Sequence, residues 1–297
     1  AFASKIISDR FPGQEGNPVE IVIPKGALVQ PEVTKYISEV SKVDGIVRVS
    51  PPQIFGNDLR ITAVHSMPPR TLKGESLIKD IREIKSPEGT LIGGIAADYA
   101  DTQIGIAKTM PWALTWIAVG VLILLFVFTG SIILPIKAVI LNILSLAATL
   151  GAITWIFVDG HLRWLVGDFT VTGAVDTGSI ILVAVVAFGL SMDYELFLLS
   201  RIKEEHDAGK SNIESVAIGL QRSARIITAA AGLLAIVFAS FIISGVTSIK
   251  MLGFGVAFAI LLDATLVRAL LVPALMRLFG ERNWWAPKSM KRFTINH

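Results

Sequence analysis

Cysteine is absent from the 297 residues of this chain, and histidine occurs only four times. Without thiols the chain has no disulfide, no zinc finger and no cysteine nucleophile. The histidines are scattered and lack the close spacing of a metal site; they are His65, His161, His206 and His297. The sequence therefore predicts no metal centre, and no other cofactor.

Charge is also scarce. Charged residues make up 17% of the chain and hydrophobic residues 53%, whereas a soluble domain carries about 25% charged residues. The shortage is uneven, because residues 1–108 have an ordinary polar composition and nearly all of the hydrophobicity follows Pro111. We therefore expect a soluble domain over 1–108, followed by a membrane-embedded part. The net charge of +3, without interleaved basic and aromatic residues, gives no reason to expect a nucleic acid partner.

The membrane-embedded part contains five long apolar segments. A helix needs about 20 apolar residues to cross a bilayer, and each segment has that length or slightly more. The predicted spans are about 109–136, 138–158, 177–200, 226–249 and 251–272. We expect a transmembrane bundle over 109–280 and a tail over 281–297. No signal peptide opens the chain, and its first residues, Ala1 to Lys5, resemble the end of a missing helix.

Basic residues near the ends of the spans predict the orientation. If the amino-terminal domain lies outside the cell, eleven Lys and Arg residues fall on the cytoplasmic side, against only Arg163 and Lys250 in the short outer loops. All six tryptophans fall near the expected interfaces, as in an aromatic belt. The sequence thus predicts a multi-pass plasma-membrane protein with an extracytoplasmic domain and a cytoplasmic tail.

The outer domain shows alternating strand and helix patterns. Strands are predicted at 19–23, 46–50, 59–64 and 90–95, and helices at 31–43 and 75–84. The order β-α-β-β-α-β is that of a ferredoxin-like fold, so the fold class is an α+β membrane protein. That fold hosts many functions and fixes none by itself.

Asp193 is the most informative residue, because it is an acid in an otherwise apolar span. An ionised carboxylate at the bilayer centre costs about 2.5–3.5 kcal/mol on insertion scales, so it usually has a function such as proton relay. A structural acid bonded to a neighbouring helix is the alternative. Gly189, one turn earlier, would let another helix approach closely. Tyr194 either orients a partner carboxyl or packs, and Glu195, about 200° round the helix from Asp193, is expected to be solvated or to snorkel.

Asp263 is a second acid within a span. It follows Gly255 and Ala259 at four-residue spacing, which is a narrow face suited to close helix packing. Asp263 either joins the relay or makes a structural bond. On an ideal α-helix Arg268 lies about 140° away from Asp263, so we expect no direct pair, and we expect Arg268 to snorkel to the cytoplasmic headgroups.

Two further patterns have simpler interpretations. The small residues Thr228–Gly232, with Ala235 and Ala239, form a seam typical of helix packing. The segment Asp207–Ser211 resembles the end of a P-loop, but Glu204 stands where that motif requires glycine. We therefore expect a cytoplasmic turn without an ATP site.

Several motifs together resemble the MmpL branch of the resistance-nodulation-division transporters. They are Gly189–Arg201 with its Asp-Tyr pair, Leu262–Arg268, Leu271–Leu275, Gly280–Trp285 with its Asn-Trp-Trp run, Phe11–Gly13 and Asn17-Pro18. They look like the carboxy-terminal half of such a protein, which has two halves of six spans, each with an outer porter subdomain. The resemblance implies a sterol-sensing-like bundle and a proton relay through Asp193 and Tyr194. It also implies a partner for Asp193 on the missing amino-terminal half.

The function that the resemblance implies is proton-driven export of lipids or other hydrophobic compounds, without enzymatic activity. A homo-oligomer is compatible with it. A non-transporting lipid-sensing or scaffold protein is the alternative. An intramembrane aspartyl protease is less favoured, because such enzymes carry Tyr-Asp and Gly-x-Gly-Asp, whereas here Asp193 precedes Tyr194 and follows Met192.

Overall fold

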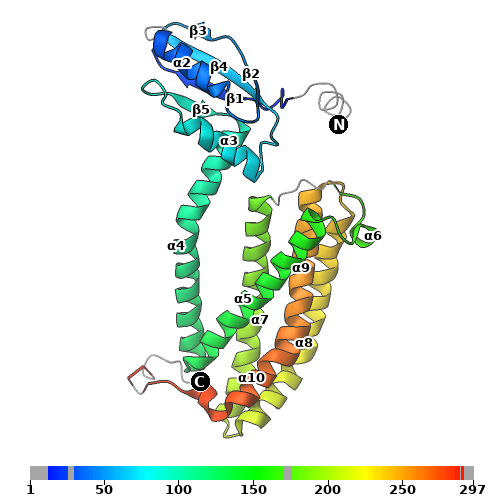
Figure 1. The fold of residues 1–297 in the computed structure, drawn as a ribbon. Helices are drawn as coiled ribbons and strands as arrows, with labels where there is room; N and C mark the ends of the chain where they lie inside the picture. Colours follow the sequence, from blue (N-terminus) through cyan, green and yellow to red (C-terminus); the bar gives the residue numbers. More distant parts are fainter. Residues whose placement is uncertain (1–12, 26–29, 170–175, 288, 291–297) are drawn as a thin grey trace. The chain divides into compact units, whose positions relative to one another are not determined.

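The computed structural model describes residues 13–25, 30–169, 176–287 and 289–290. It divides into two compact units, Ala1–Pro111 and Trp112–His297, each drawn in Figure 1. The predicted motif residues Phe11 and Pro12, the first residues Ala1 to Lys5, and residues 288 and 291–297 of the predicted tail lie outside the described residues.

The first unit is built on an antiparallel sheet of five strands. They are β1 (Val19–Ile23), β2 (Ile46–Val49), β3 (Gln53–Phe55), β4 (Asp58–His65) and β5 (Leu91–Gly93). The order is β2-β4-β1-β5, and β3 pairs with β4 beside β2. The short β3 was not predicted; it forms a hairpin with β4 that turns at Gly56, whose φ of +64° suits glycine. On β1, Val19, Ile21 and Ile23 alternate with partly exposed residues and are fully buried.

Two helices pack on the sheet and contribute to the core of this unit. They are α2 (Gln30–Val40) and α3 (Leu72–Glu83). Val33 and Tyr36 of α2 and Leu77 and Ile81 of α3 join the buried strand residues in one apolar cluster. The hydroxyl of Thr71 accepts a hydrogen bond from the Gly74 amide at 3.3 Å, which caps the start of α3.

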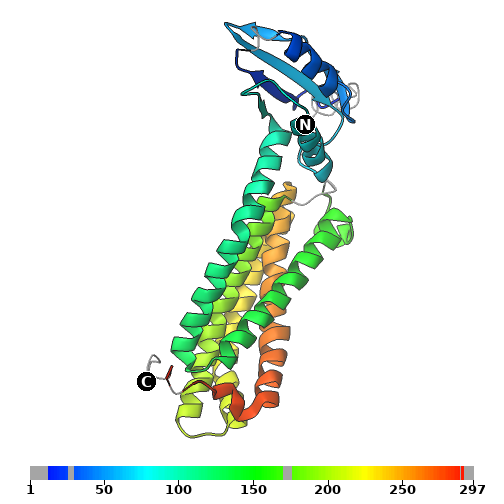
Figure 2. The same cartoon turned by 60° about the vertical axis from the view of Figure 1, so that its left-hand side comes forward.

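The described residues contain five helices long and apolar enough to cross a membrane. The elements are α4 (Ile95–Thr129), α5 (Ile133–Ile153) with the π-helical turn η2 (Thr154–Val158), α6 (Arg163–Val166), α7 (Thr177–Asp207), α8 (Asn212–Ser240) with η3 (Phe241–Ile243), α9 (Thr247–Leu262), η4 (Asp263–Leu271), α10 (Val272–Phe279) and η5 (Gly280–Trp284). A multi-pass membrane protein with a small antiparallel sheet is therefore the fold class. Figures 1 and 2 both show α5 running obliquely across the other helices of the second unit.

Small residues set the closest helix contacts in the second unit. A Cβ at Gly219 of α8 would lie 2.9 Å from the backbone of Ile202 on α7, so only glycine allows this approach. The buried face of α8 continues at four-residue spacing through Ser223, Ile227, Ala231 and Ala235.

Lys250, which the sequence placed in an outer loop, lies inside α9 and donates from Nζ to the Val166 carbonyl at 3.0 Å.

Candidate functional site

A π-helical segment places two opposite charges inside the bundle. Residues Asp263–Leu271 continue α9 as η4, and the wider turns of a π-helix, with their i→i+5 hydrogen bonds, bring each residue closer in direction to the fifth one before it than an α-helix does. Arg268 thereby reaches Asp263, and its Nη2 is 2.5 Å from Oδ2 of the acid. The expectation that these two residues do not pair was wrong, because it assumed ideal α-helical geometry.

Arg268 is also not directed to the headgroups. It is 2% exposed, and its guanidinium donates a hydrogen bond to the Ser191 backbone carbonyl on α7. The Ser191 hydroxyl in turn donates to Oδ1 of Asp263 at 2.8 Å. These three buried residues, Ser191, Asp263 and Arg268, are called the Asp263 network below. The network joins α7 to η4 through charge-assisted bonds.

The guanidinium of Arg268 is only partly satisfied by protein. Its Nε and Nη1 have no hydrogen-bond partner among the described residues, and its Cζ lies 5.2 Å from the centre of the Tyr194 ring. Tyr194, Asp263 and Arg268, among others, line a cavity. The volume that the centre of a water molecule can occupy in it is about 10 Å³. A space of this size holds one water when polar groups line it.

A second cavity of about 10 Å³ lies on another side of Asp263. Asn142 and Ser145 of α5 line it together with Ser191 and Asp263. Asp263 thus borders two polar spaces, each with room for one water. A carboxyl with a hydroxyl, a guanidinium and adjacent room for water is suited to holding and passing a proton.

The structure places Asp193 differently from Asp263. Asp193 is exposed in this chain. Gly189, one turn earlier on the same face of α7, is exposed too, and no atom lies within 4 Å of the position that a Cβ would take there. Within the described residues, the face of α7 that carries both is therefore uncovered. The relay role of Asp193 stays a prediction.

Glu195 is buried, with 5% of its surface exposed, so the expectation that it is solvated or snorkels was wrong. It lines a cavity with Lys137 of α5. Its place on the helix could be derived from the sequence, but the helix packed against that face could not.

Gly255 and Ala259 lie on the face that leads to Asp263. A Cβ at Gly255 would be 2.6 Å from Cδ1 of Ile153 and 3.0 Å from Cγ1 of Val183, so α9 fits closely between α5 and α7 there. Ala259 is 5% exposed and lines both cavities beside Asp263. Its small side chain leaves room for these cavities.

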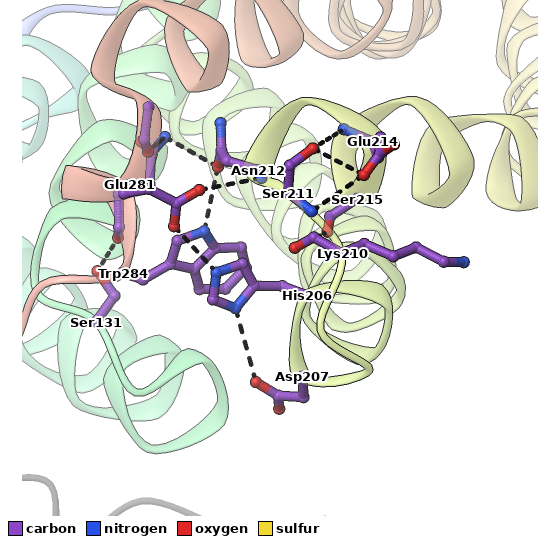
Figure 3. Close-up of polar contacts among 12 residues, drawn as sticks. Ser131, His206, Asp207, Lys210, Ser211, Asn212, Glu214, Ser215, Glu281 and Trp284 are labelled. Atoms are coloured by element: carbon purple, nitrogen blue, oxygen red, sulfur yellow. Dashed lines mark hydrogen bonds and ion pairs between the residues drawn. The ribbon is translucent and has the colours of Figure 1, made fainter.

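A second polar cluster ties η5 to the turn between α7 and α8, as Figure 3 shows. Trp284 donates from Nε1 to Oδ1 of Asn212 at 3.1 Å and stacks on His206 with ring centres 4.1 Å apart. Oε1 of Glu281 accepts a hydrogen bond from the backbone amide of Asn212 at 3.1 Å. We call this end of the second unit, formed by the turn between α7 and α8 and by η5, the loop end. Sequence reasoning missed the cluster, although the Asn-Trp-Trp run was the signal for it.

The cluster also explains why the P-loop-like segment is not a phosphate site. Ser211 caps α8 in a reciprocal capping box with Glu214. The amide of Asn212 is already bonded to Glu281. The amides of a phosphate cradle must be available, and here protein oxygens occupy this start of α8. Across the described residues, no group of three or more His, Cys, Asp or Glu is arranged to hold a metal.

Comparison with known proteins identifies a matching family and several relatives of this chain. The model of the MMPL family matches residues 71–295. The membrane protein SCO6666 of Streptomyces coelicolor is 43% identical over 73% of this chain and 30% of its own length. The trehalose monomycolate exporter MmpL3 of Mycobacterium tuberculosis is 35% identical over 95% of this chain and 31% of its own length. The heme uptake protein MmpL11 of the same organism is 33% identical over 93% and 30%.

The chain therefore spans less than a third of the length of these relatives. Four of the six motifs that suggested the resemblance, among them Gly189–Arg201 and Leu262–Arg268, fall inside the matched region. The predicted resemblance is thereby confirmed. The family match covers most of the chain, and the same residues form helices that can span a membrane, so the chain belongs to the MMPL family of membrane transporters.

Proposed function

We propose that this chain is part of a proton-driven exporter of lipids or other hydrophobic compounds. The observation that carries the proposal is the Asp263 network: Ser191, Asp263 and Arg268 form a polar centre, with water-sized cavities, inside apolar helices. Intramembrane ionisable groups of this kind are typical of proton pathways. The names of MmpL3 and MmpL11 support a hydrophobic cargo, since one is called a trehalose monomycolate exporter and the other a heme uptake protein.

The relay in this proposal centres on Asp193 and Tyr194. Tyr194 lies beside Arg268 and lines the same cavity as Asp263, so the helix turn that carries Asp193 is in contact with the Asp263 network. An acid left bare in hydrocarbon would be expensive. The exposed face with Asp193 and Gly189 therefore suits contact with the amino-terminal half of the transporter, which would supply a partner carboxyl.

The proposed topology places residues 1–108 outside and the loop end in the cytoplasm. The bias of eleven basic residues against two supports it. The outer unit would be a ferredoxin-like porter domain, supported by the helices α2 and α3 and by the strand order β2-β4-β1-β5. Single cysteines at Glu88 and Ala208 should react with a membrane-impermeant reagent from opposite sides. Reaction of both from the same side would exclude this topology.

The energy source is tested with the full-length transporter in liposomes. A lipid cargo should accumulate across the membrane when a proton gradient is imposed, and accumulation should stop when a protonophore collapses the gradient. Because the relatives' names describe both export and uptake, both gradient orientations are needed. Equal transport with and without a gradient would refute proton driving.

The alternative of a non-transporting lipid-sensing or scaffold protein predicts lipid binding without accumulation in the same liposomes.

The protease alternative loses support from the geometry of the acids. Asp263 is paired with Arg268 and Ser191, and among the described residues no hydrogen bond joins it to Asp193. The two acids are therefore not arranged to share a proton as in aspartyl proteases.

A further inference from the structure

Glu195 is a buried acid that the proposed relay does not yet use. It is 5% exposed. Within the described part of the chain, its carboxylate makes no hydrogen bond and no ion pair within 4.0 Å. Asp263 and Glu205, the other buried acids of the bundle, each have two partners. A buried carboxylate without a direct partner is unusual, because desolvation of the charge is left uncompensated.

The space beside Glu195 explains how the acid is accommodated. Glu195 and Lys137 line a cavity of about 10 Å³, whose other walls are apolar side chains such as Leu141 and Met276. This is room for one water. Such a water would lie between a carboxyl and an ammonium group and could bond to both.

Glu195 also continues the Asp263 network toward the loop end. It follows Ser191 by four residues, so both side chains lie on the same face of α7, about 6 Å apart along the helix axis. The charged groups that act on Glu195 are Arg268 and Asp263 from η4 and Lys137 from α5. Glu195 thus lies one helical turn from Ser191 of the network and shares its cavity with Lys137.

Lys137 connects this cavity to the loop end itself. Its Nζ donates a hydrogen bond to Oδ1 of Asn283 in η5 and lies 5.0 Å from the centre of the Phe279 ring. Asn283 is fully buried and bonds to the Met276 and Gly280 carbonyls at 2.6 and 2.7 Å. The ammonium group is therefore held in place beside the cavity.

We propose that Glu195 is a second proton-carrying residue, which releases protons toward the loop end through the water of the cavity that it shares with Lys137. The carboxyl receives a proton from the side of the Asp263 network. It then loses the proton to the cavity water, which passes it on, and a carboxylate remains. Lys137 keeps its own protons, and its positive charge offsets that carboxylate. This proposal rests on the proposed proton-driven function and assigns a residue to its last step.

The first test measures titration without transport. In the purified full-length protein, acidification should produce an infrared carboxylic-acid C=O band that is absent from Glu195→Gln. The control is Glu204→Gln, an exposed acid on the same helix paired with Arg201, which should keep the band. An identical band in the wild type and in a correctly folded Glu195→Gln protein would overturn the proposal.

The second test measures coupling in liposomes. Glu195→Gln should lose gradient-driven transport but keep cargo exchange at equal pH, which needs no net proton movement, and Glu195→Asp should restore part of the driven transport. Full driven transport in Glu195→Gln would overturn the assignment. If instead the wild type ignores the proton gradient while the infrared band of Glu195 is present, the proposed function fails and the titration of Glu195 stands.

Discussion

Two arginine–carboxylate pairs, one in each unit, have the same chemistry and different surroundings. In the sheet of the first unit, Arg60 binds Glu20 through two hydrogen bonds of 2.8 and 3.0 Å, and the arginine side chain is 48% exposed. In the second unit Arg268 binds Asp263 at 2.5 Å, and its side chain is 3% exposed. Water can satisfy the remaining N–H groups of Arg60. Two nitrogens of Arg268 have no partner among the described residues.

The difference shows what each pair can do. An exposed pair contributes little because solvent screens it and replaces its partners. A buried pair gains little net stability either, since desolvation offsets the attraction, but removing one partner leaves an uncompensated charge. The pair in the bundle therefore makes its two residues depend on each other, and we interpret its presence inside apolar helices as functional.

Arg268→Met should have the largest effect. It leaves the Asp263 carboxylate buried without a counter-ion, so the free energy of unfolding should fall by about 3–5 kcal/mol. The double variant Asp263→Asn/Arg268→Met should recover most of this loss, because no charge is left alone. Unfolding of the full-length protein in detergent measures both. A double variant as unstable as the single one would show that packing, not charge, holds the site.

Ser191→Ala should have an intermediate effect. It removes one hydrogen bond to the Asp263 carboxylate, and bonds to charged groups contribute about 1.5–3 kcal/mol. Ser200→Ala is the matched control, since Ser200 lies on the same helix and, among the described residues, its hydroxyl bonds within that helix to the Phe197 carbonyl at 2.9 Å. Equal destabilisation by the two substitutions would show that the bond to Asp263 contributes no more than a hydrogen bond within one helix.

Glu20→Gln should have the smallest effect. The hydrogen bonds and charge of Arg60 hold the pKa of Glu20 below its usual range. A lowered pKa means that the pair stabilises the fold at neutral pH and that this contribution disappears as the pH falls through the lowered value. The difference in unfolding temperature between wild type and variant should therefore be small at neutral pH and vanish in acid. A difference that grows in acid would contradict the assignment.

Local patterns predicted much of the fold, because alternation and apolar runs determine strands and spans directly. The helix expected at 75–84 is α3 (Leu72–Glu83), and the strand expected at 19–23 is β1. The hairpin strand β3 escaped notice because three exposed residues carry no alternation signal. The fourth span was predicted to begin at residue 226, whereas α8 begins at Asn212. The prediction began too late because the first turns of α8 carry charged residues.

The site was less predictable, because it depends on contacts between helices. Asp263 was recognised as an acid in a span, but the π-helical turn that brings Arg268 over it has no signal in residue spacing. The burial of Glu195 comes from packing against other helices, and the cavity beside it is shared with Lys137 on α5. The cluster of Asn212, His206 and Trp284 likewise joins residues distant in sequence.

Asp193→Asn in the full-length transporter is the most direct test of the proposed proton coupling. Asparagine keeps the size and hydrogen-bonding capacity of the side chain but cannot release a proton. In liposomes with matched protein content, the variant should transport cargo no faster with a proton gradient than without one, while cargo exchange at equal pH continues. Gradient-driven transport at the wild-type rate by a correctly folded Asp193→Asn protein would contradict the account.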